Sequence, residues 1–291
     1  MAKITWLASY PKSGNTWTRV FLTNYWRNGD APADINELEE TPIASSRHIF
    51  DEYSGVDSGD LTADEIDRLR PAIYRYYAHD LEKQGREERY CKIHDAYTFL
   101  PDGQALFPPD ITAGAIYILR NPLDVAVSYA NHNHSTVERS VEFMAMPNHT
   151  LAKGRGGLAN QVHQLLLTWS EHINSWMNVT TFPTHLIRYE DMIADPLTAF
   201  TGVIRFIGGD VTDAARIDKA IRFSAFEELQ KQEQEKGFRE KMPLSKMFFR
   251  KGKIGSWREK LSPELAERLM RDHREVMLKY GYLTEEGELV Y

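Results

Sequence analysis

Short apolar runs alternate along the chain with longer segments in which apolar residues recur at helical spacing. The short runs predict strands at residues 4–10, 90–94, 115–119 and 185–189. The longer segments predict helices at residues 16–26, 62–80, 123–132, 158–174, 196–207, 212–221 and 263–280. Because this alternation is typical of a central parallel sheet flanked by helices, we predict the α/β class. No repeat and no linker rich in Gly, Ser or Pro divides the chain, so we expect one domain over residues 1–291.

Two long stretches between the predicted elements are expected to be loops. Residues 144–157 contain Pro147 and several glycines, and residues 232–253 are highly charged. Loops of this length inside a compact domain are more often functional than merely connecting. We therefore expect loops near residues 144–157 and 232–249 to close over both bound ligands.

The segment from Trp6 to Trp17, Trp-Leu-Ala-Ser-Tyr-Pro-Lys-Ser-Gly-Asn-Thr-Trp, predicts a strand, a loop and the start of a helix. A loop that enters a helix N-terminus presents backbone N–H groups and the positive end of the helix dipole. Lys12 adds a full positive charge to this loop, and Ser13, Asn15 and Thr16 add further donors. Together these groups indicate a site for a phosphate-like anion.

A nucleotide kinase or another phosphate-loop NTPase is one alternative for this loop, but the order of residues matches poorly. The NTPase motif places its lysine after the glycines, whereas Lys12 precedes Gly14. A second predicted strand ends at Arg120, where an NTPase would place an acid that holds Mg²⁺. An arginine at a strand end can bind a phosphate with both arms, and Ser128 lies two helical turns further on. The structural alternative is that Arg120 forms an ion pair with Asp124.

A third motif, Phe-Arg-Lys-Gly-Lys-Ile-Gly-Ser-Trp, spans residues 249–257. Its three cations and two glycines describe a flexible loop that would attract anions. Taken alone, such a charge run is usually a solvated turn.

Composition narrows the class of protein. The chain has 42% hydrophobic and 26% charged residues, as globular proteins do, and a net charge of −7. This charge argues against a general nucleic-acid binder, so an anion site must be a local basic pocket. No apolar run is long enough for stable membrane insertion, the N-terminus lacks the pattern of a signal peptide, and Cys91 is the single cysteine. We expect a cytoplasmic protein.

Taken together, the three motifs resemble those of the cytosolic-type sulfotransferases that use 3′-phosphoadenosine 5′-phosphosulfate (PAPS). That family has Tyr-Pro-Lys-Ser-Gly-Thr-Thr-Trp near its start, Arg-Asn-Pro-x-Asp-x-x-Val-Ser in the middle and Arg-Lys-Gly-x-x-Gly-Asp-Trp near its end. The order and spacing agree over nearly the whole chain, with Asn15 in place of Thr and Ser256 in place of Asp. The resemblance implies a fold like that of nucleotide kinases, PAPS as co-substrate, adenosine 3′,5′-bisphosphate (PAP) as its product, and no metal.

The resemblance also assigns roles to residues that match the family motifs. It implies a 5′-phosphosulfate loop made of Lys12, Ser13, Gly14, Asn15, Thr16 and Trp17, with Trp17 near the adenine. It implies a 3′-phosphate site made of Arg120, Ser128, Arg250, Lys251 and Gly252. It implies further nucleotide contacts from Tyr189, Ser224 and Phe226. The family's Lys-Thr-His appears as Lys92-Ile-His94, in which the His is the general base and the Lys assists at the sulfuryl group.

The chemistry of sulfuryl transfer supports these roles independently. The acceptor hydroxyl must lose its proton as the S–O bond forms, and a histidine suits this task. Lys92 and His94 project to one face of a strand, and His94 lies at its predicted carboxyl end. The alternative is a hydrogen-bonded core histidine. Lys12 would stabilise the charge that grows on the leaving 5′-phosphate.

Other candidate features lead to weaker expectations. His132 and His134 suggest zinc, but residues at that spacing do not face each other on a helix and no Cys or carboxylate partner is evident. They would line the acceptor pocket or face solvent. Aromatic residues in 74–97 and 143–146 either shape that pocket or belong to the core. Of the family's dimer signature only Glu267 is kept, with Arg258, Ser262 and Pro263 at the other places.

We therefore predict a sulfotransferase that moves the sulfuryl group from PAPS to a hydroxyl of a small-molecule acceptor by in-line transfer. His94, Lys12 and Lys92 would be the catalytic residues. The alternatives are a nucleotide kinase-like NTPase and a module that binds adenosine bisphosphate without turnover. An intact set of Lys12, Lys92 and His94 argues against the second, because a sensor has no use for a positioned base.

Overall fold

The computed structural model describes residues 1–152, 159–241 and 247–291, and the chain falls into two compact units. The first unit comprises Met1–Tyr10, Glu40–Tyr117 and Pro147–Leu186. The second unit comprises Pro11–Glu39, Ile118–Met146 and Ile187–Tyr291. Within the described residues, no helix combines the length and the apolar character that a membrane span requires. The expectation of one domain over residues 1–291 stays a prediction.

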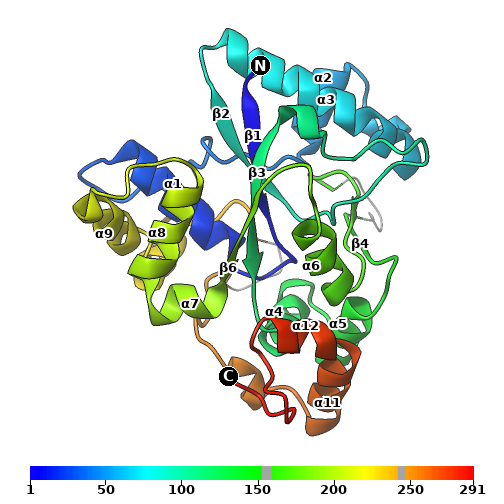
Figure 1. Ribbon diagram of the computed structural model, residues 1–291, viewed down its shortest axis with the longest axis vertical. Coiled ribbons are helices and arrows are strands. Elements are labelled where there is room, and N and C mark those ends of the chain that lie inside the picture. The colour runs from blue at the N-terminus through cyan, green and yellow to red at the C-terminus, as the bar shows by residue number, and fades with distance from the viewer. Residues whose placement is uncertain (153–158, 242–246) are drawn as a thin grey trace. The chain divides into compact units, whose positions relative to one another are not determined.

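Four strands form a sheet in the order β2-β1-β3-β6 (Figure 1). They are β1 (Lys3–Ala8), β2 (Glu88–Ile93), β3 (Thr112–Leu119) and β6 (Thr184–Arg188). β1 is buried beyond its first residue and pairs in parallel with both β2 and β3. Because the register pairs Ala8 with Ile93, the next residues, Ser9 and His94, leave the sheet side by side. The predicted parallel sheet is confirmed.

The first unit builds its core where a long helix packs on the sheet. Its helices are α2 (Arg47–Ser54), α3 (Ala63–Lys83) and α6 (Trp169–Met177), with the 3-10 turns η1 (Ser58–Asp60) and η2 (Pro109–Ile111). The short strands β4 (Thr150–Leu151) and β5 (Gln164–Leu165) pair antiparallel. Tyr74 of α3 and Phe107 contact the buried indole of Trp6 on β1, with ring centroids 5.2 and 4.9 Å away. Capping boxes fix the starts of α3 and α6.

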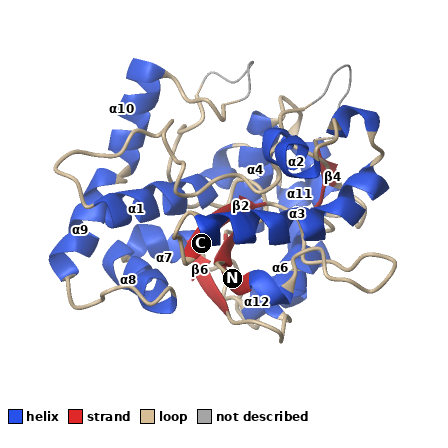
Figure 2. Ribbon diagram, turned by 90° about the horizontal axis from the view of Figure 1, so that it is seen from above, coloured by secondary structure: helices blue, strands red, loops and turns tan. Residues whose placement is uncertain are grey.

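The second unit is mostly helical. Its helices are α1 (Asn15–Arg27), α4 (Pro122–His132), α5 (Val137–Met144), α7 (Tyr189–Ala194), α8 (Pro196–Phe206), α9 (Ala214–Phe223), α10 (Phe226–Lys236), η3 (Ser256–Glu259), α11 (Pro263–Asp272) and α12 (Arg274–Lys279). Helices α1, α8 and α9 pack together (Figure 2). A cluster around Val20, Leu229 and Phe249 joins α1 and α10 to the start of the third motif.

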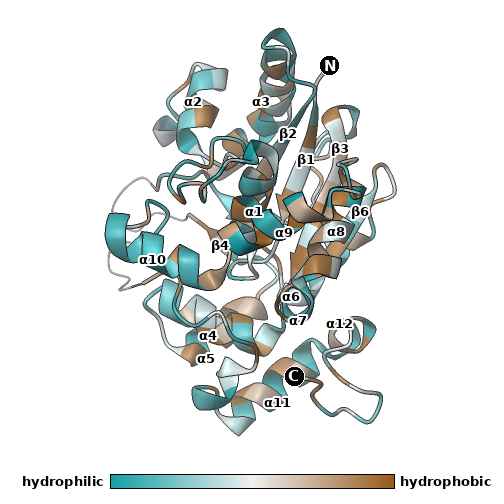
Figure 3. Ribbon diagram, turned by 90° about the vertical axis from the view of Figure 1, so that its left-hand side faces the viewer, coloured by the Kyte–Doolittle hydropathy of each residue, from teal (hydrophilic) through white to brown (hydrophobic). Residues whose placement is uncertain are grey.

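Several predicted elements are corrected by the structure. Residues 158–174 do not form one helix, because β5 lies within them and α6 begins only at Trp169. The helix predicted at 263–280 is interrupted at His273, and Tyr189 begins a helix rather than ending a strand. Part of the loop predicted at 232–253 belongs to α10, whose surface is largely hydrophilic (Figure 3). The rest of that loop and of the 144–157 loop includes 242–246 and 153–157, outside the described residues, so closure over ligands stays a prediction.

Candidate functional site

The loop between β1 and α1 forms one wall of the candidate site in the second unit. Lys12 and Gly14 both have positive φ angles, 70° and 107°. Gly14 is the N-cap of α1 and has no side chain to satisfy the first N–H groups, which makes this helix end suited to an anion. A Cβ atom on Gly14 would lie 2.8 Å from the ring of Tyr189. Glycine is therefore required here both for its backbone angle and for the close approach of Tyr189.

Buried donors without a partner surround this loop. Among the described residues, nothing hydrogen-bonds the hydroxyl of Ser13, which is 1% exposed, or the indole N–H of Trp17. The Nε–H of Arg120 is also buried and has no hydrogen-bond partner among the described residues. A buried polar group left unsatisfied costs about 1–3 kcal/mol. Ligand oxygens would satisfy these atoms, so the residues fit an anionic ligand such as a nucleotide phosphate.

Arg120 connects the first motif with the third. It follows β3 directly and precedes α4, and its guanidinium donates to the carbonyl oxygen of Lys12 at 3.1 Å and to that of Lys253 at 3.3 Å. The same guanidinium lies 4.2 Å from the ring centroid of Tyr189, a cation–π contact. The arginine thus lies among segments that are far apart in the sequence.

Asp124 does not form the ion pair with Arg120 that was the structural alternative from the sequence. Its carboxylate accepts hydrogen bonds from the backbone N–H groups of Gly255 and Trp257, at 2.8 and 2.9 Å, and from the Ser256 hydroxyl at 3.0 Å. Asp124 is only 1% exposed. The second motif therefore fixes the end of the third motif through a buried carboxylate.

The beginning of the third motif is fixed by a second buried carboxylate. Glu233 on α10 accepts from the N–H groups of Phe248 and Phe249 at 2.7 and 2.8 Å. Between the two anchored ends, Arg250 is exposed and Lys251 forms an ion pair with Glu259. Gly252 has a φ of 60°, and a Cβ there would lie 2.5 Å from the ring of Phe226. Phe226 and Gly252, both predicted nucleotide contacts, thus lie against each other.

The ammonium group of Lys12 contacts the residue that directly precedes the third motif. Its Nζ lies 3.8 Å from the ring centroid of Phe248. This cation–π contact gives the charge of Lys12 a defined position over an aromatic face. Sequence reasoning did not identify Phe248, although it comes directly before the predicted motif.

Tyr189 and Trp17 form the aromatic part of the site. Tyr189, the first residue of α7, is 6% exposed and meets the Trp17 ring edge-on at 5.8 Å. Burial raises the pKa of the Tyr189 phenol, so it stays neutral at physiological pH. Asn15 and Thr16 are buried at the start of α1.

Two of the predicted serines differ in how their hydroxyls are placed. Ser224 is fully buried, and its hydroxyl donates to the carbonyl oxygens of Ala220 and Ile221 at 2.9 and 3.1 Å. That hydroxyl is used within the end of α9. Ser128 is half-buried on α4. All the predicted nucleotide-binding residues thus lie in the second unit.

Lys92 and His94, the remaining predicted catalytic residues, lie in the first unit. Lys92 is 7% exposed on β2, and its backbone N–H donates to the carbonyl oxygen of Pro42 at 2.8 Å. The Nδ1 of His94 lies 2.8 Å from the carbonyl oxygen of Ser9 and 3.2 Å from its hydroxyl. Because a carbonyl oxygen only accepts, Nδ1 carries the hydrogen and Nε2 carries the lone pair. This tautomer is the one a general base at Nε2 requires.

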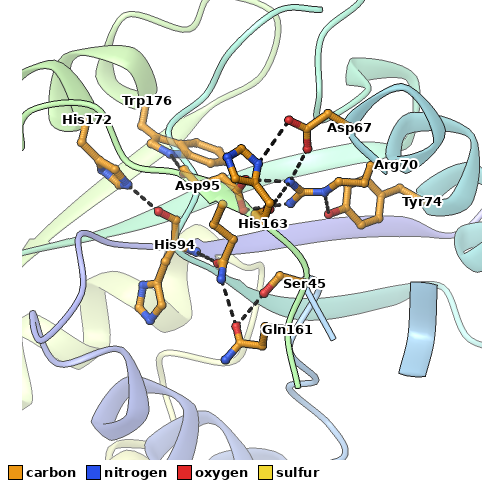
Figure 4. A network of polar contacts seen from close by, with 11 residues as sticks. Ser45, Asp67, Arg70, Tyr74, His94, Asp95, Gln161, His163, His172 and Trp176 are labelled. Atoms are coloured by element: carbon orange, nitrogen blue, oxygen red, sulfur yellow. Dashed lines mark hydrogen bonds and ion pairs between the residues drawn. The ribbon is translucent and has the colours of Figure 1, made fainter. Parts of the chain in front are cut away.

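The residues around His94 form a polar network that sequence reasoning missed (Figure 4). Asp95 and Arg70, each 1% exposed, form a two-armed ion pair at 2.7 and 2.8 Å. His172 Nε2 donates to the carbonyl oxygen of His94 at 2.9 Å. A charged residue placed directly after His94 in a buried strand end is the one sequence signal that could have indicated this network.

Comparisons with known proteins give one family. The family model of the sulfotransferase domain matches residues 3–281. Cytosolic sulfotransferase 16 of Arabidopsis thaliana is 24% identical over 279 residues, which are 90% of this chain and 72% of the relative. Sulfotransferase 1A1 of Bos taurus is 26% identical over 259 residues, 87% of this chain and 76% of the relative.

A solved structure shares the fold. Retinol dehydratase, crystallised in complex with androsterone and the inactive cofactor PAP, has a TM-score of 0.58 to this chain. The two sequences are 20% identical, and the match covers 99% of this chain and 82% of the other. The predicted resemblance in fold to sulfotransferases is confirmed.

Proposed function

The chain belongs to the sulfotransferase family, and from that premise we propose that it transfers the sulfuryl group of PAPS to a hydroxyl of a small-molecule acceptor, with His94 as general base. The predicted family is confirmed by the match over residues 3–281. One observation carries the proposal for the donor: Lys12, Arg120, Tyr189 and the third motif come together in one unit around buried donors without partners.

The donor would be held by groups from all three motifs. The helix end at Asn15, the hydroxyl of Ser13 and the ammonium of Lys12 suit the 5′-phosphosulfate. The guanidinium of Arg120 keeps Nε–H for the 3′-phosphate, and Arg250 is exposed to join it. Trp17 and Phe226 would contact the adenine. The donor set consists of cations and N–H groups, which suits phosphate without requiring a metal.

In the proposed reaction the acceptor oxygen forms a bond to sulfur while the bond from sulfur to the 5′-phosphate oxygen breaks. The electron pair of the breaking bond stays on the phosphate, where Lys12 stabilises it. The proton of the acceptor hydroxyl passes to Nε2 of His94, whose Nδ1–H stays bonded to the Ser9 carbonyl. Lys92 assists at the sulfuryl group.

The acceptor class is proposed only as far as a small molecule with a hydroxyl. Androsterone in the retinol dehydratase structure belongs to that protein, and it supports a small-molecule acceptor for this family. A cytoplasmic location is proposed on the names of the Arabidopsis relatives, which are called cytosolic.

Two measurements test the donor and the reaction. Isothermal titration should show tight binding of PAP and weak binding of ATP with Mg²⁺. Radiolabelled PAPS with a panel of phenols, sterols, sugars and alcohols should label at least one acceptor. Tight binding of ATP with Mg²⁺ and none of PAP would return the chain to the kinase alternative. Binding of PAP with no transfer to any acceptor would favour the module without turnover.

The role of His94 is tested by His94→Ala. Loss of the general base should lower kcat by about 10²–10⁴-fold while PAP affinity stays within twofold, because the substitution leaves every proposed donor contact intact. His79→Ala, an exposed histidine on α3, is the matched control and should keep the wild-type rate. An unchanged kcat in His94→Ala would remove the proposed base.

A further inference from the structure

Three backbone groups at His94 and Asp95 are hydrogen-bonded to partners outside their strand. The His94 N–H donates to the side-chain oxygen of Gln164 at 3.3 Å, and the His94 carbonyl accepts from His172 at 2.9 Å. The Asp95 carbonyl accepts from the indole N–H of Trp176 at 2.9 Å. Strand ends ordinarily lose such order because their neighbours stop pairing. This strand end instead keeps it beyond β2.

The strongest part of this network is the ion pair at Asp95. Arg70 lies in the middle of α3, and its guanidinium grips both carboxylate oxygens of Asp95 (Figure 4). Arg70 makes further bonds, with Nε donating to the Tyr74 hydroxyl at 3.0 Å and Nη1 donating to the Asp67 carboxylate at 3.1 Å and to the carbonyl oxygen of His163 at 3.2 Å. A buried pair of this kind is rarely justified by stability, since hydrophobic residues of similar size often serve as well.

We propose that Arg70 and Asp95, together with His172, are positioning residues that hold the imidazole of His94 for proton abstraction. This inference rests on the proposed function of His94 as general base. The ion pair fixes the Cα of Asp95, and His172 fixes the carbonyl between His94 and Asp95. These contacts restrain the peptide that joins His94 to Asp95. The buried network thereby orients Nε2, the proton acceptor, and the Ser9 carbonyl sets the tautomer of the His94 ring.

His172 is built for this task. Its ring lies fully buried, with Nδ1 at 2.7 Å from the Tyr117 hydroxyl and Nε2 at the His94 carbonyl. Since a carbonyl oxygen needs a donor, Nε2 carries the hydrogen and Nδ1 accepts from Tyr117. Burial lowers the pKa of His172 to about 4, which keeps it neutral and its tautomer fixed.

The test is Arg70→Lys, which keeps the charge and loses the two-armed geometry. We expect kcat to fall by about tenfold to a hundredfold, as displaced catalytic groups do, with the KM for PAPS within twofold of wild type. Arg75→Lys is the matched control, because Arg75 lies on the same helix and binds Asp110 with two arms at 2.8 and 3.0 Å, but is only half-buried. It should keep the wild-type kcat.

The same change in a His94→Ala background separates positioning from general loosening. If Arg70 acts through His94, Arg70→Lys should change the residual rate of His94→Ala by less than twofold. An equal fall in both backgrounds, or no fall in the wild type, would overturn the inference. A His94→Ala variant with full activity would instead overturn the proposed base itself.

A second pair of variants applies if Arg70→Lys fails to fold. His172→Gln keeps an N–H donor for the His94 carbonyl, and His172→Phe removes it. We expect kcat to be at least fivefold higher in His172→Gln than in His172→Phe, with equal KM values for PAPS. Equal kcat values in the two folded variants would contradict the inference.

Discussion

The candidate donor site in the second unit and the segment after β2 in the first unit differ in how their buried polar groups are bonded. In the second unit, Ser13 and Arg120 bury donors that no described residue satisfies, and Lys12 and Gly252 hold left-handed backbone. In the first unit, the segment that follows β2 has the His94 N–H, the His94 and Asp95 carbonyls and the Asp95 carboxylate all hydrogen-bonded. A region that receives a charged ligand keeps donors for that ligand. In a region that holds one proton acceptor in place, here the His94 imidazole, the hydrogen-bond donors are occupied by protein groups.

The largest effect is expected from a substitution in the candidate donor site of the second unit. Lys12→Ala should lower kcat by about 10²–10³-fold and weaken PAP binding much less, because the cation acts most strongly on charge that develops in the transition state. Steady-state kinetics and titration with PAP measure the two effects. Lys253→Ala is the control, since Lys253 is exposed and meets Arg120 through its carbonyl only. An equal loss of kcat and of PAP affinity would contradict the assignment of Lys12.

The buried network around His94 is tested by the dependence of protein stability on pH. Burial lowers the pKa of His172 to about 4, below the ordinary value of 6.5, so the unfolded chain takes up a proton that the folded protein resists. Stability should therefore fall as the pH drops from about 6.5 toward 4, and this residue alone should account for about 2 kcal/mol between pH 7 and pH 5.

Urea unfolding of wild type and His172→Gln at pH 7 and pH 5 checks this contribution. The variant should lose less stability on acidification than the wild type. Burial also lowers the pKa of His273 to about 4. Both the wild type and His172→Gln should therefore keep part of the dependence of unfolding free energy on pH. Identical slopes would show that His172 does not resist protonation.

The smallest effect concerns two glycines with the same backbone. Gly252 and Gly55 have φ angles of 60° and 68°, but a Cβ would strike the Phe226 ring only at Gly252. Gly55→Ala should cost about 1–2 kcal/mol of stability from the backbone alone. Gly252→Ala should cost more and weaken PAP binding by about tenfold, since the third motif must shift. Equal unfolding free energies and unchanged PAP affinity would show that the close packing is unimportant.

The sequence predicted the features that depend on neighbouring residues. The strands, the loop at Lys12–Gly14 and the three motifs all rest on local spacing, and the structure places the second and third motifs beside the first. Helix α10 escaped prediction because its sequence is almost entirely polar, and only Leu229 and a few others bury.

Side-chain pairing across the fold could not be predicted in the same way. Arg70 and Asp95 lie 25 residues apart, and His172 and His94 lie 78 apart, so no periodicity links them. The hydroxyl of Ser224 is engaged by its own helix, a choice that depends on the local end of α9 rather than on the motif. The assignment of individual nucleotide contacts stays a prediction for the titrations above.

Two of the acidic residues that contribute to the negative net charge of the chain have a structural role, because they anchor the third motif. Asp124 and Glu233 each fix one end of the segment that carries Arg250 and Lys251. Acids in the interior thus shape the surface that attracts an anion outside. We expect a substitution that removes either acid to lower donor affinity, because one end of the third motif would lose its anchor.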